Sequence, residues 1–395
     1  ELGKGDCMSE WISTTVGALG KVITGKTPSK DNPEDWGNEY LFVTPSDYGS
    51  YNKYARYSLR GISDTGYQRH KVRVIPKDSC LVTCIGSDMG KVVKNAKDAF
   101  CNQQINALIP NESIVHSDYA YYFFKDSAQL LKTLGSDGTA VPILNKSDFE
   151  RIELALPSLP EQKAIASVLS SLDDKIDLLH RQNKTLEAMA ETLFRQWFIE
   201  DTEGRTELIT LGEMIEIHDS KRIPLSKLER DKKKNGSIMY PYYGAAKVMD
   251  YVDDYIFDGD YLLLGEDGTV QDENGYPILQ RANGKFWVNN HAHVLSAKAP
   301  YNNFFLWCLL SKTNIEKAVT GAVQPKINQE NLRKLDFVKF DESKVLDFND
   351  ITSSMLNKLN TNNSQIQTLE NLRDTLLPKL MSGEVRVQYQ TEEVA

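Results

Sequence analysis

Two stretches of the chain place apolar residues at alternating steps of three and four, which is the spacing of a heptad repeat. The first stretch runs from Ile165 to Trp197. Pro160 and Glu161 precede it, and both suit a first helical turn, because proline lacks an N–H that would go unpaired there and an acid favours the helix dipole. We predict a long helix over 159–203. The predicted helix–helix seam of this stretch consists of Ile165, Leu169, Leu172, Ile176, Leu179, Asn183, Leu186 and Leu193.

A second, weaker heptad stretch lies further along, where Lys358 corresponds to Lys175, and predicts a helix over 342–383. Thr352, Asn362 and Arg373 interrupt its apolar seam. If the two helices pack antiparallel, Asn183 lies opposite Asn362, and two buried amides could satisfy each other and fix the register. The alternative, that each heptad is simply part of a core, stays open. The predicted seam residues of the second helix are Leu359, Asn362, Ile366, Leu369 and Leu376.

The number of residues that separates Lys175 from Lys358 also separates other matching segments, so the chain contains an internal repeat that extends through its whole length. This offset is 183 in the helices and at a Gly/Pro/Asn block, and it drifts upstream to 187 and then 192. We therefore predict a mixed α/β (α+β) fold with an internal pseudo-twofold repeat. Two globular domains, over 1–158 and 204–341, would be separated by two long antiparallel coiled-coil helices, with a tail over 384–395. The matching blocks begin at Gly138 and Gly321, at Asn102 and Asn289, and at Leu19 and Leu211.

The composition is that of an ordinary globular protein and adds three limits. At 395 residues the chain is too long for one domain, and 41% hydrophobic with 26% charged residues argues against disorder. No apolar run approaches the ~18–20 residues that cross a membrane. Five cysteines are too few and odd in number for a disulfide framework, so we expect buried free thiols and a reducing cytoplasm. Residues 1–7 lack a Met and are interpreted as a leader or a cloning remnant, with Met8 a candidate start.

The net charge of −9 is unevenly distributed. Positions 248–280 hold nine acids and no Lys or Arg, whereas positions 50–77 hold seven bases and one acid. A second basic run with tyrosines lies in the other half, around 221–243. Cations beside tyrosine rings are typical of a surface that binds DNA phosphates, although either run could be a solvated loop.

Two strand-like segments rich in amides and imidazoles, 102–106 and 289–293, lie at matching places of the repeat. Asn and Gln match the edge of adenine in the major groove, and Arg and Lys match that of guanine. These side chains could equally satisfy turn backbones. The candidate DNA-contacting residues of both halves are Lys26, Thr27, Ser29, Lys53, Tyr54, Arg56, Arg60, Arg69, Lys71, Arg73, Gln103, Gln104, Asn106, Lys221, Arg222, Lys232, Lys233, Lys234, Tyr242, Tyr243, Asn290, His291 and His293.

The segment from Gly20 to Thr27 fits the pattern of a phosphate-binding P-loop. That pattern requires a helix that begins at the Lys-Thr pair and aims its N-terminus at phosphates. Pro28 disfavours helical geometry at Thr27, so we do not expect nucleotide binding here. We find no catalytic or metal-ligand motif and predict a chain that binds but does not catalyse.

Taken together, these segments resemble the specificity subunit of type I restriction-modification enzymes over essentially the whole chain. The resemblance is carried by the Gly-x-Thr-Pro segment of 24–29, by the Leu-Pro-x-x-x-Glu-Gln segment of 156–165, and by the segments 285–291 and 372–383. One departure concerns the second half, where His218 to Pro224 stands in place of the Gly-x-Thr-Pro motif.

The resemblance implies a DNA-specificity subunit that is not itself an enzyme. It implies two target recognition domains, each reading half of a bipartite asymmetric site in double-stranded DNA, with the helices setting their spacing. It also implies two modification (methyltransferase) subunits docked on the helices, and restriction (translocase/nuclease) subunits that join them in a prokaryotic cytoplasm. Methyl donor, ATP and Mg²⁺ would belong to those partners, with no cofactor of the chain's own. The alternatives are a helical scaffold that does not read DNA and a P-loop nucleotide-dependent enzyme.

Overall fold

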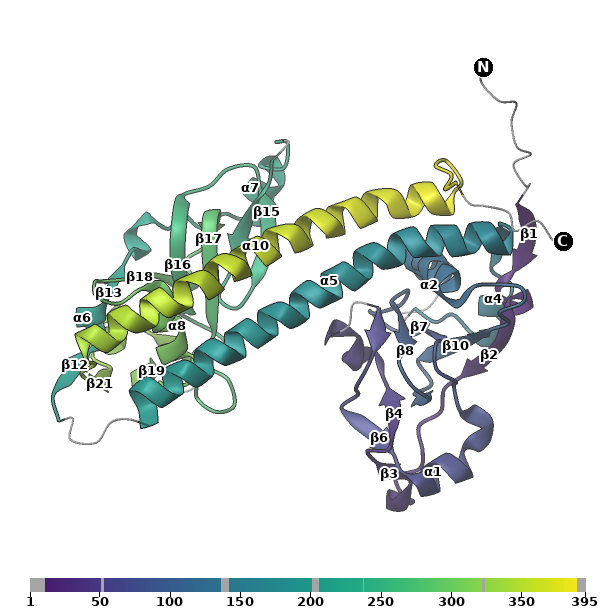
Figure 1. Cartoon of the computed structure of the whole chain (residues 1–395), viewed down its shortest axis with the longest axis horizontal. Coiled ribbons are helices and arrows are strands. Elements are labelled where there is room, and N and C mark those ends of the chain that lie inside the picture. Colours follow the sequence, from purple (N-terminus) through teal and green to yellow (C-terminus); the bar gives the residue numbers. More distant parts are fainter. Residues whose placement is uncertain are drawn as a thin grey trace. The chain divides into compact units, whose positions relative to one another are not determined.

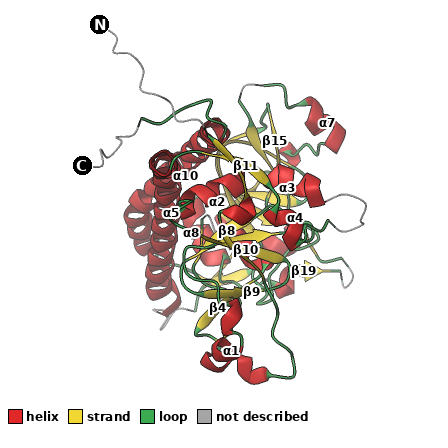
Figure 2. Cartoon of the chain, turned by 90° about the vertical axis from the view of Figure 1, so that its right-hand side faces the viewer, coloured by secondary structure: helices red, strands yellow, loops and turns green. Residues whose placement is uncertain are grey.

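The computed structural model describes residues 11–50, 53–135, 142–200, 206–236, 238–321 and 324–388. The leader and the parts of the Gly/Pro/Asn block at 138–141 and 322–323 lie outside these ranges. The chain divides into two compact units, residues 1–180 with 364–395, and residues 181–363. Strands and helices are interleaved in both units, so the fold is mixed α/β (Figures 1 and 2).

The first unit contains a five-stranded sheet of order β2-β10-β7-β8-β5, a four-stranded sheet of order β3-β6-β4-β9 and a β1-β11 pair. Helix α2 packs against β7 and β8, and its buried aromatic side chains join the largest core of this unit. The strands are β1 (Ile12–Thr15), β2 (Gly20–Thr24), β3 (Trp36–Gly37), β4 (Tyr40–Val43), β5 (Tyr54–Ala55), β6 (Arg60–Ile62), β7 (Cys80–Thr83), β8 (Val92–Asn95), β9 (Ala99–Cys101), β10 (Ile105–Pro110) and β11 (Glu153–Leu156). The helices are η1 (Val16–Ala18), η2 (Pro33–Asp35), η3 (Pro45–Ser50), α1 (Asp64–Arg69), η4 (Lys71–Arg73), α2 (Ser117–Asp126), α3 (Ala128–Gly135) and α4 (Lys146–Glu150).

The second unit is built on a six-stranded sheet of order β13-β18-β16-β17-β14-β15, with the pairs β12-β21 and β19-β20 beside it. Helix α8 is apolar on nearly all sides and packs on β16 and β18. The strands are β12 (Leu208–Thr210), β13 (Ile215–Ile217), β14 (Tyr240–Tyr243), β15 (Val248–Val252), β16 (Phe257–Gly265), β17 (Leu279–Val288), β18 (Ala292–Ala297), β19 (Val319–Thr320), β20 (Lys326–Ile327) and β21 (Asp336–Val338). The helices are α6 (Leu211–Met214), η6 (Asp219–Lys221), α7 (Lys227–Lys232), α8 (Asn303–Leu310), η7 (Glu316–Ala318) and α9 (Gln329–Arg333).

The Gly/Pro/Asn block of the repeat ends in the same local structure in both units. Asn145 caps α4 by accepting a hydrogen bond from the amide of Asp148, and Asn328 caps α9 by accepting one from the amide of Asn331. An Asn side chain at this position satisfies an amide that would otherwise be unpaired at the start of the helix. The Asn of each block is therefore explained by helix capping.

Two long helices contribute residues to both units: α5 (Leu159–Phe194), followed by a π-helical segment η5 (Arg195–Glu200), and α10 (Glu342–Met381) (Figure 1). In the first unit, Ile165 and Leu169 of α5 share a core with Leu377 and Leu380 of α10. Further along, Ile176 and Leu179 pack with Ile366 and Leu369. Since the α5 numbers rise as the α10 numbers fall, the helices pair antiparallel within this unit.

The predicted meeting of Asn183 and Asn362 is confirmed in the second unit. The Asn362 amide donates to Asn183 Oδ1 at 2.8 Å, and the Asn183 amide donates to Asn363 Oδ1 at 2.8 Å. Asn362 is fully buried and Asn183 nearly so. The ring of Phe194 meets that of Phe348 further along, so this half of the pair also runs antiparallel.

The predicted seam is wrong at one place. Leu172 is only half-buried, and the neighbouring Asp173 takes the buried position instead. Asp173 accepts hydrogen bonds from Arg373 Nη1 at 2.9 Å and from the Tyr122 hydroxyl at 2.8 Å. Arg373, which interrupts the second heptad, is therefore the partner of a buried carboxylate. Leu186, Leu193, Leu369 and Leu376 pack at the edges of the cores as half-buried residues, and Leu359 and Ile366 are buried.

The Leu-Pro-x-x-x-Glu-Gln segment fastens the start of α5 to the rest of the first unit. Gln162 accepts from the amide of His116 and donates to the carbonyls of Ile114 and Pro157. Glu161, 1% exposed, accepts from Arg386 at 2.6 Å. The part of the predicted tail that is described, 384–388, thus folds back onto α5, and Val387 packs against the main core of this unit.

The cysteines agree with the prediction of buried free thiols as far as the described residues go. Cys80, Cys84, Cys101 and Cys308 are all buried and unpaired with one another. Burial raises the pKa of the Cys80 thiol to about 12, so it stays protonated and unreactive at neutral pH. Among the helices of the described ranges, none is long and apolar enough to cross a membrane.

Candidate nucleic-acid interface

In the first unit, the Gly-x-Thr-Pro loop lies directly beside the turn between β9 and β10. A Cβ on Gly25 would stand 2.1 Å from the carbonyl oxygen of Asn102, so glycine is required for the loop to approach this closely. The Thr27 hydroxyl donates to Gln103 Oε1 at 2.9 Å. Lys26, Ser29 and Gln103 are exposed on this surface, and Ser29 also bonds Asp31.

In the amide-rich turns, some side chains satisfy the turn backbone and others are exposed, so the two interpretations of these segments apply to different residues. Asn102 Oδ1 accepts from the amide of Gln104 at 3.1 Å, and Asn289 Oδ1 accepts from the amide of His291 at 2.8 Å. The first Asn of each segment therefore satisfies the turn backbone. Gln103 and Asn290 are exposed, Gln104 is half-buried, and His291 is exposed with its Nδ1 2.7 Å from Asp267 Oδ1. Gln103, Asn290 and His291 are thus exposed to a ligand, whereas Gln104 Oε1 already accepts from the Asn102 side-chain amide at 2.8 Å.

Several bases of the first basic run are engaged within the protein. Lys53, 4% exposed, bonds Ser170 of α5 at 2.8 Å and Asp118 of α2 at 3.1 Å. Arg56 pairs with Asp177 of α5 at 3.1 Å, and the Tyr54 ring lies within 5.5 Å of three cations. This part of the run attaches the globular part of the unit to α5.

The other bases of that run are either bonded to neighbouring groups or exposed to solvent. Arg69 pairs with Asp35 and Glu34, and Arg73 donates to the carbonyl of Thr24 at 3.0 Å beside the Gly-x-Thr-Pro loop. The Arg60 guanidinium lies 3.5 Å from the centre of the Trp36 ring, and Arg60 is exposed to solvent. Lys71 is exposed and makes no ion pair within the described ranges.

In the second unit, the local acids neutralise much of the basic run. Lys233 pairs with Asp254 at 2.9 Å, and Lys234 pairs with Asp250 at 3.0 Å and with Asp231. Lys221 and Lys232 are exposed and unpaired in the described part of the chain. Tyr243 is half-buried against Phe286. The acidic stretch thus lies opposite the predicted DNA-binding lysines, which weakens the case for this run as a phosphate-binding surface.

Five of the predicted DNA contacts are corrected by the structure, because their side chains are buried or nearly so and already bonded: Lys53, Asn106, Arg222, Tyr242 and His293. Tyr242 is 1% exposed, with its hydroxyl at the backbone of Leu225. The other four are held by groups that lie far away in the sequence. A contact with DNA would require these side chains to leave their partners.

Sequence reasoning missed the groups that hold these buried cations. Lys94, 1% exposed, bonds Asp118 and Ser117 of α2. Burial raises the pKa of the Asp118 carboxyl, but Lys53 and Lys94 outweigh that effect and lower it overall. In the second unit, Asp219 holds His293 and Glu266 holds Arg222. No local pattern marks these acids, since their partners lie in elements that are remote in the sequence.

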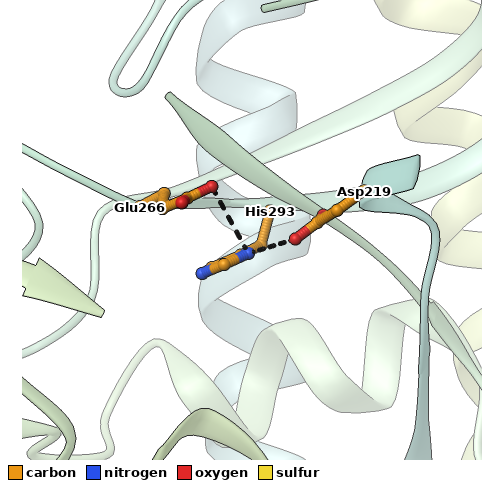
Figure 3. Close-up of side chains that lie close together, drawn as sticks. All are labelled: Asp219, Glu266 and His293. Atoms are coloured by element: carbon orange, nitrogen blue, oxygen red, sulfur yellow. Dashed lines mark hydrogen bonds and ion pairs between the residues drawn. The ribbon is translucent and has the colours of Figure 1, made fainter. Parts of the chain in front are cut away.

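Asp219, Glu266 and His293 come close enough together to suggest a metal site (Figure 3). The contacts argue against an ion. His293 Nδ1 lies 2.6 Å from Asp219 Oδ2, a direct hydrogen bond that leaves no room for a metal between them. The cation beside Glu266 is the Arg222 guanidinium, at 2.6 Å. The three residues therefore form a network of ion pairs and hydrogen bonds in which Arg222 contacts both carboxylates.

The P-loop alternative fails on local structure. Strand β2 ends at Thr24, and the chain continues through 25–32 without helical structure until η2. Lys26 and Thr27 therefore lie in an extended loop, with no helix N-terminus to bind phosphate.

The class of protein follows from this two-unit fold together with a family comparison. The model of the type I restriction modification DNA specificity domain matches residues 8–188 and again residues 204–338. The chain belongs to that family, whose members are DNA-specificity subunits and are not catalytic.

Particular relatives are similar over nearly the full length. The type I restriction enzyme MjaIX specificity subunit of Methanocaldococcus jannaschii is 26% identical over 415 residues, covering 97% of this chain and 95% of the relative. The EcoprrI specificity subunit of Escherichia coli is 23% identical and covers 82% of each chain. A crystal structure of the type I restriction-modification S subunit from M. genitalium superposes with a TM-score of 0.59, at 20% identity, over 96% of this chain and 98% of that one. That likeness supports the fold.

Proposed function

We propose that the chain is the specificity subunit of a type I restriction-modification complex and that each DNA specificity domain binds one half of a bipartite, asymmetric DNA site. One observation carries the proposal: the family model matches twice, once in each globular part of the chain. Two domains of one family with divergent sequences suit two different half-sites. The internal pseudo-twofold repeat is part of this proposal.

The proposed reading surface of each domain is the group of loops around its amide-rich turn. In the first domain it presents Lys26, Gln103 and Gln104, and in the second Lys221, Asn290 and His291. Amides and imidazoles can donate to and accept from base edges, while the lysines meet phosphates or guanine. Arg60 and Lys71 supply further positive charge in the first domain.

The two long helices are proposed to form a coiled coil that sets the spacing of the half-sites. At ~1.5 Å per residue, the 36 residues of α5 extend over about 54 Å, more than the ~34–36 Å of one duplex turn. Modification subunits are proposed to dock on these helices. In the second unit they expose a shallow groove lined by Met189, Leu193, Ile351 and Met355, apolar surface of the kind that protein partners cover.

Restriction subunits joining this complex in a prokaryotic cytoplasm complete the proposal. Methyl donor, ATP and Mg²⁺ are assigned to the partner subunits.

Selection from random duplex DNA tests the proposal. The chain, co-purified with its modification subunit, is incubated with duplexes that carry two random blocks separated by a random spacer of variable length, and the retained DNA is sequenced. We expect two short conserved blocks at one fixed spacing. Retained DNA without any conserved block would contradict sequence recognition.

The scaffold alternative is separated by the salt dependence of binding. Neutralised phosphates release counterions, so the affinity of a DNA-reading complex falls steeply as salt rises. A complex that assembles fully but binds no duplex at low salt would favour the scaffold. ATP binding that disappears in Lys26→Ala would favour the P-loop enzyme.

A further inference from the structure

Each unit contains one buried polar residue that ties the loops of its reading surface together. In the first unit it is Asn106 of β10, 2% exposed, and in the second it is His293 of β18, 1% exposed. The two residues are equivalent by the same offset that relates Asn102 to Asn289 in the amide-rich segments. Neither faces solvent, so a role in DNA recognition has to act through other residues.

His293 connects three segments of the second unit. Its Nε2 lies 2.9 Å from the carbonyl oxygen of Ile327 in β20, and its Nδ1 lies 2.6 Å from Asp219 Oδ2 in η6 (Figure 3). A carbonyl only accepts, and hydrogen bonds and neighbouring cations lower the pKa of the Asp219 carboxyl despite its burial. The Nε2 therefore donates to the Ile327 carbonyl, and the Nδ1 shares a hydrogen bond with the Asp219 carboxyl.

Arg222 extends this network to the remaining loops. Its Nη1 donates to Glu266 at 2.6 Å and to the carbonyls of Ala292 and Asn290 at 2.8 and 3.3 Å. Asp219 also accepts from the amide of Val294 and from Gln329. Two buried acids thus hold Arg222 and His293, with Lys326 3.3 Å from Glu266 at the rim. The network fixes the backbone that carries Lys221, Asn290 and His291.

Asn106 makes the corresponding contacts in the first unit without formal charges. Its Oδ1 accepts from the Thr24 hydroxyl at 2.6 Å, and its amide donates to the carbonyl of Leu144 at 3.5 Å. Leu144 corresponds to Ile327 in the Gly/Pro/Asn block of the repeat, so Asn106 and His293 bind the same backbone carbonyl of the repeat. Thr24 is the second partner of Asn106 in the first unit, as Asp219 is the second partner of His293 in the second unit.

The backbone around the two residues is held in the same way. The amide of Cys84 donates to the carbonyl of Gln104 at 2.7 Å, and that of Glu266 donates to His291 at 2.8 Å. The carbonyls of Cys84 and Glu266 then accept from Leu144 and Ile327, both at 2.8 Å. The scaffold is therefore shared, and the side chains that link it are what differs between the domains.

We propose that Asn106 and His293 are positioning residues, each of which holds the reading loops of its own domain and thereby sets sequence preference in one half of the target and not in the other. The inference rests on the proposed function. A polar residue that merely filled the core would not bond both η6 and β20 and, through Asp219 and Arg222, the backbone of Asn290. In the second unit the position of the loops depends on the hydrogen bonds that His293 makes to Asp219 and to Ile327.

The test measures half-site preference in the complete complex with modification subunits. After selection has defined the target, affinities are determined for that duplex and for duplexes with one base pair changed in either half. In His293→Asn, the Asn has one nitrogen in place of the two imidazole nitrogens that reach Asp219 and Ile327, and its Oδ1 can only accept. We expect the discrimination against substitutions in one half to fall about tenfold, the scale of one mismatched base pair, and discrimination in the other half to stay unchanged.

Two further variants provide the matched controls. Thr24→Val removes the hydroxyl that Asn106 accepts from, and we expect it to relax the opposite half. The double variant Asp219→Thr with His293→Asn rebuilds the Thr24–Asn106 pair in the second unit and should recover preference there. If His293→Asn does not fold, Thr24→Val carries the test alone: relaxed preference in one half supports the positioning role, and two unchanged halves overturn it.

The outcomes separate the inference from the proposed function. If the unchanged complex selects no sequence, the proposed function fails. If it selects a bipartite site but His293→Asn and Thr24→Val leave both halves unchanged, or weaken both halves equally, the positioning role is overturned.

Discussion

Replacing Arg373 by Met should destabilise the first unit strongly, because the substitution leaves the buried carboxylate of Asp173 without its cationic partner. Asp173 is wholly inaccessible and loses its 2.9 Å partner, keeping the Tyr122 hydroxyl and Lys125 at 3.7 Å. Removing one member of a buried ion pair costs about 3–5 kcal/mol, and Lys125 favours the lower end. At roughly 2–4 °C per kcal/mol for a unit of this size, the unfolding temperature should fall by roughly 10 °C.

The assay is calorimetric unfolding of the chain, because two units can unfold in separate transitions. The double variant Asp173→Leu with Arg373→Met removes both charges and should recover most of the lost stability. Arg151→Met is the matched control, since its pair with Asp148 is exposed and should be worth under about 1 kcal/mol. A loss below about 1 kcal/mol in Arg373→Met, or a double variant no more stable than the single, would refute the reasoning.

Three other predictions concern pH, salt and spacing. The pKa of Asp118 is lowered in the folded state, so its stabilisation is complete above the unfolded value of about 4 and disappears as pH falls through the folded value; Asp118→Asn should therefore flatten the dependence of the urea midpoint on pH below about 4. Lys221→Ala should reduce the slope of log affinity against log salt by about 1 if this lysine meets a phosphate, and an unchanged slope would remove it from the interface. Seven residues inserted at matching points of α5 and α10 lengthen each by about 10.5 Å, so selection should return a spacer longer by about 3 base pairs; an unchanged spacer would exclude the helices as its determinant.

The heptads predict the long helices well, because an apolar stripe is a local property of sequence. The predicted helices begin at 159 and 342, and α5 and α10 begin at Leu159 and Glu342. The pairing of Asn183 with Asn362 followed from register alone. The exchange of Leu172 for Asp173 could not be foreseen, since it depends on Arg373 and Tyr122 arriving from two other elements.

The candidate site was predicted less well, because the burial of its side chains also depends on partners from elements that are remote in the sequence. A lysine in a basic run looks the same in sequence whether it meets DNA or a buried acid, and Lys53 meets Asp118 of α2, an element far from it along the chain. Asn102 and Gln103 are neighbours with similar side chains, yet one caps a turn and the other is exposed. Which of them faces outward is decided by the turn geometry.

The division of the chain also bears on how the protein is made. The second unit is one continuous segment, 181–363, whereas the first needs residues 1–180 together with 364–395. Leu377 and Leu380 belong to the main core of the first unit, and Arg386 covers Glu161. We therefore expect the second unit to fold first during synthesis, because the first unit cannot be completed until residues 364–395 have been made as well.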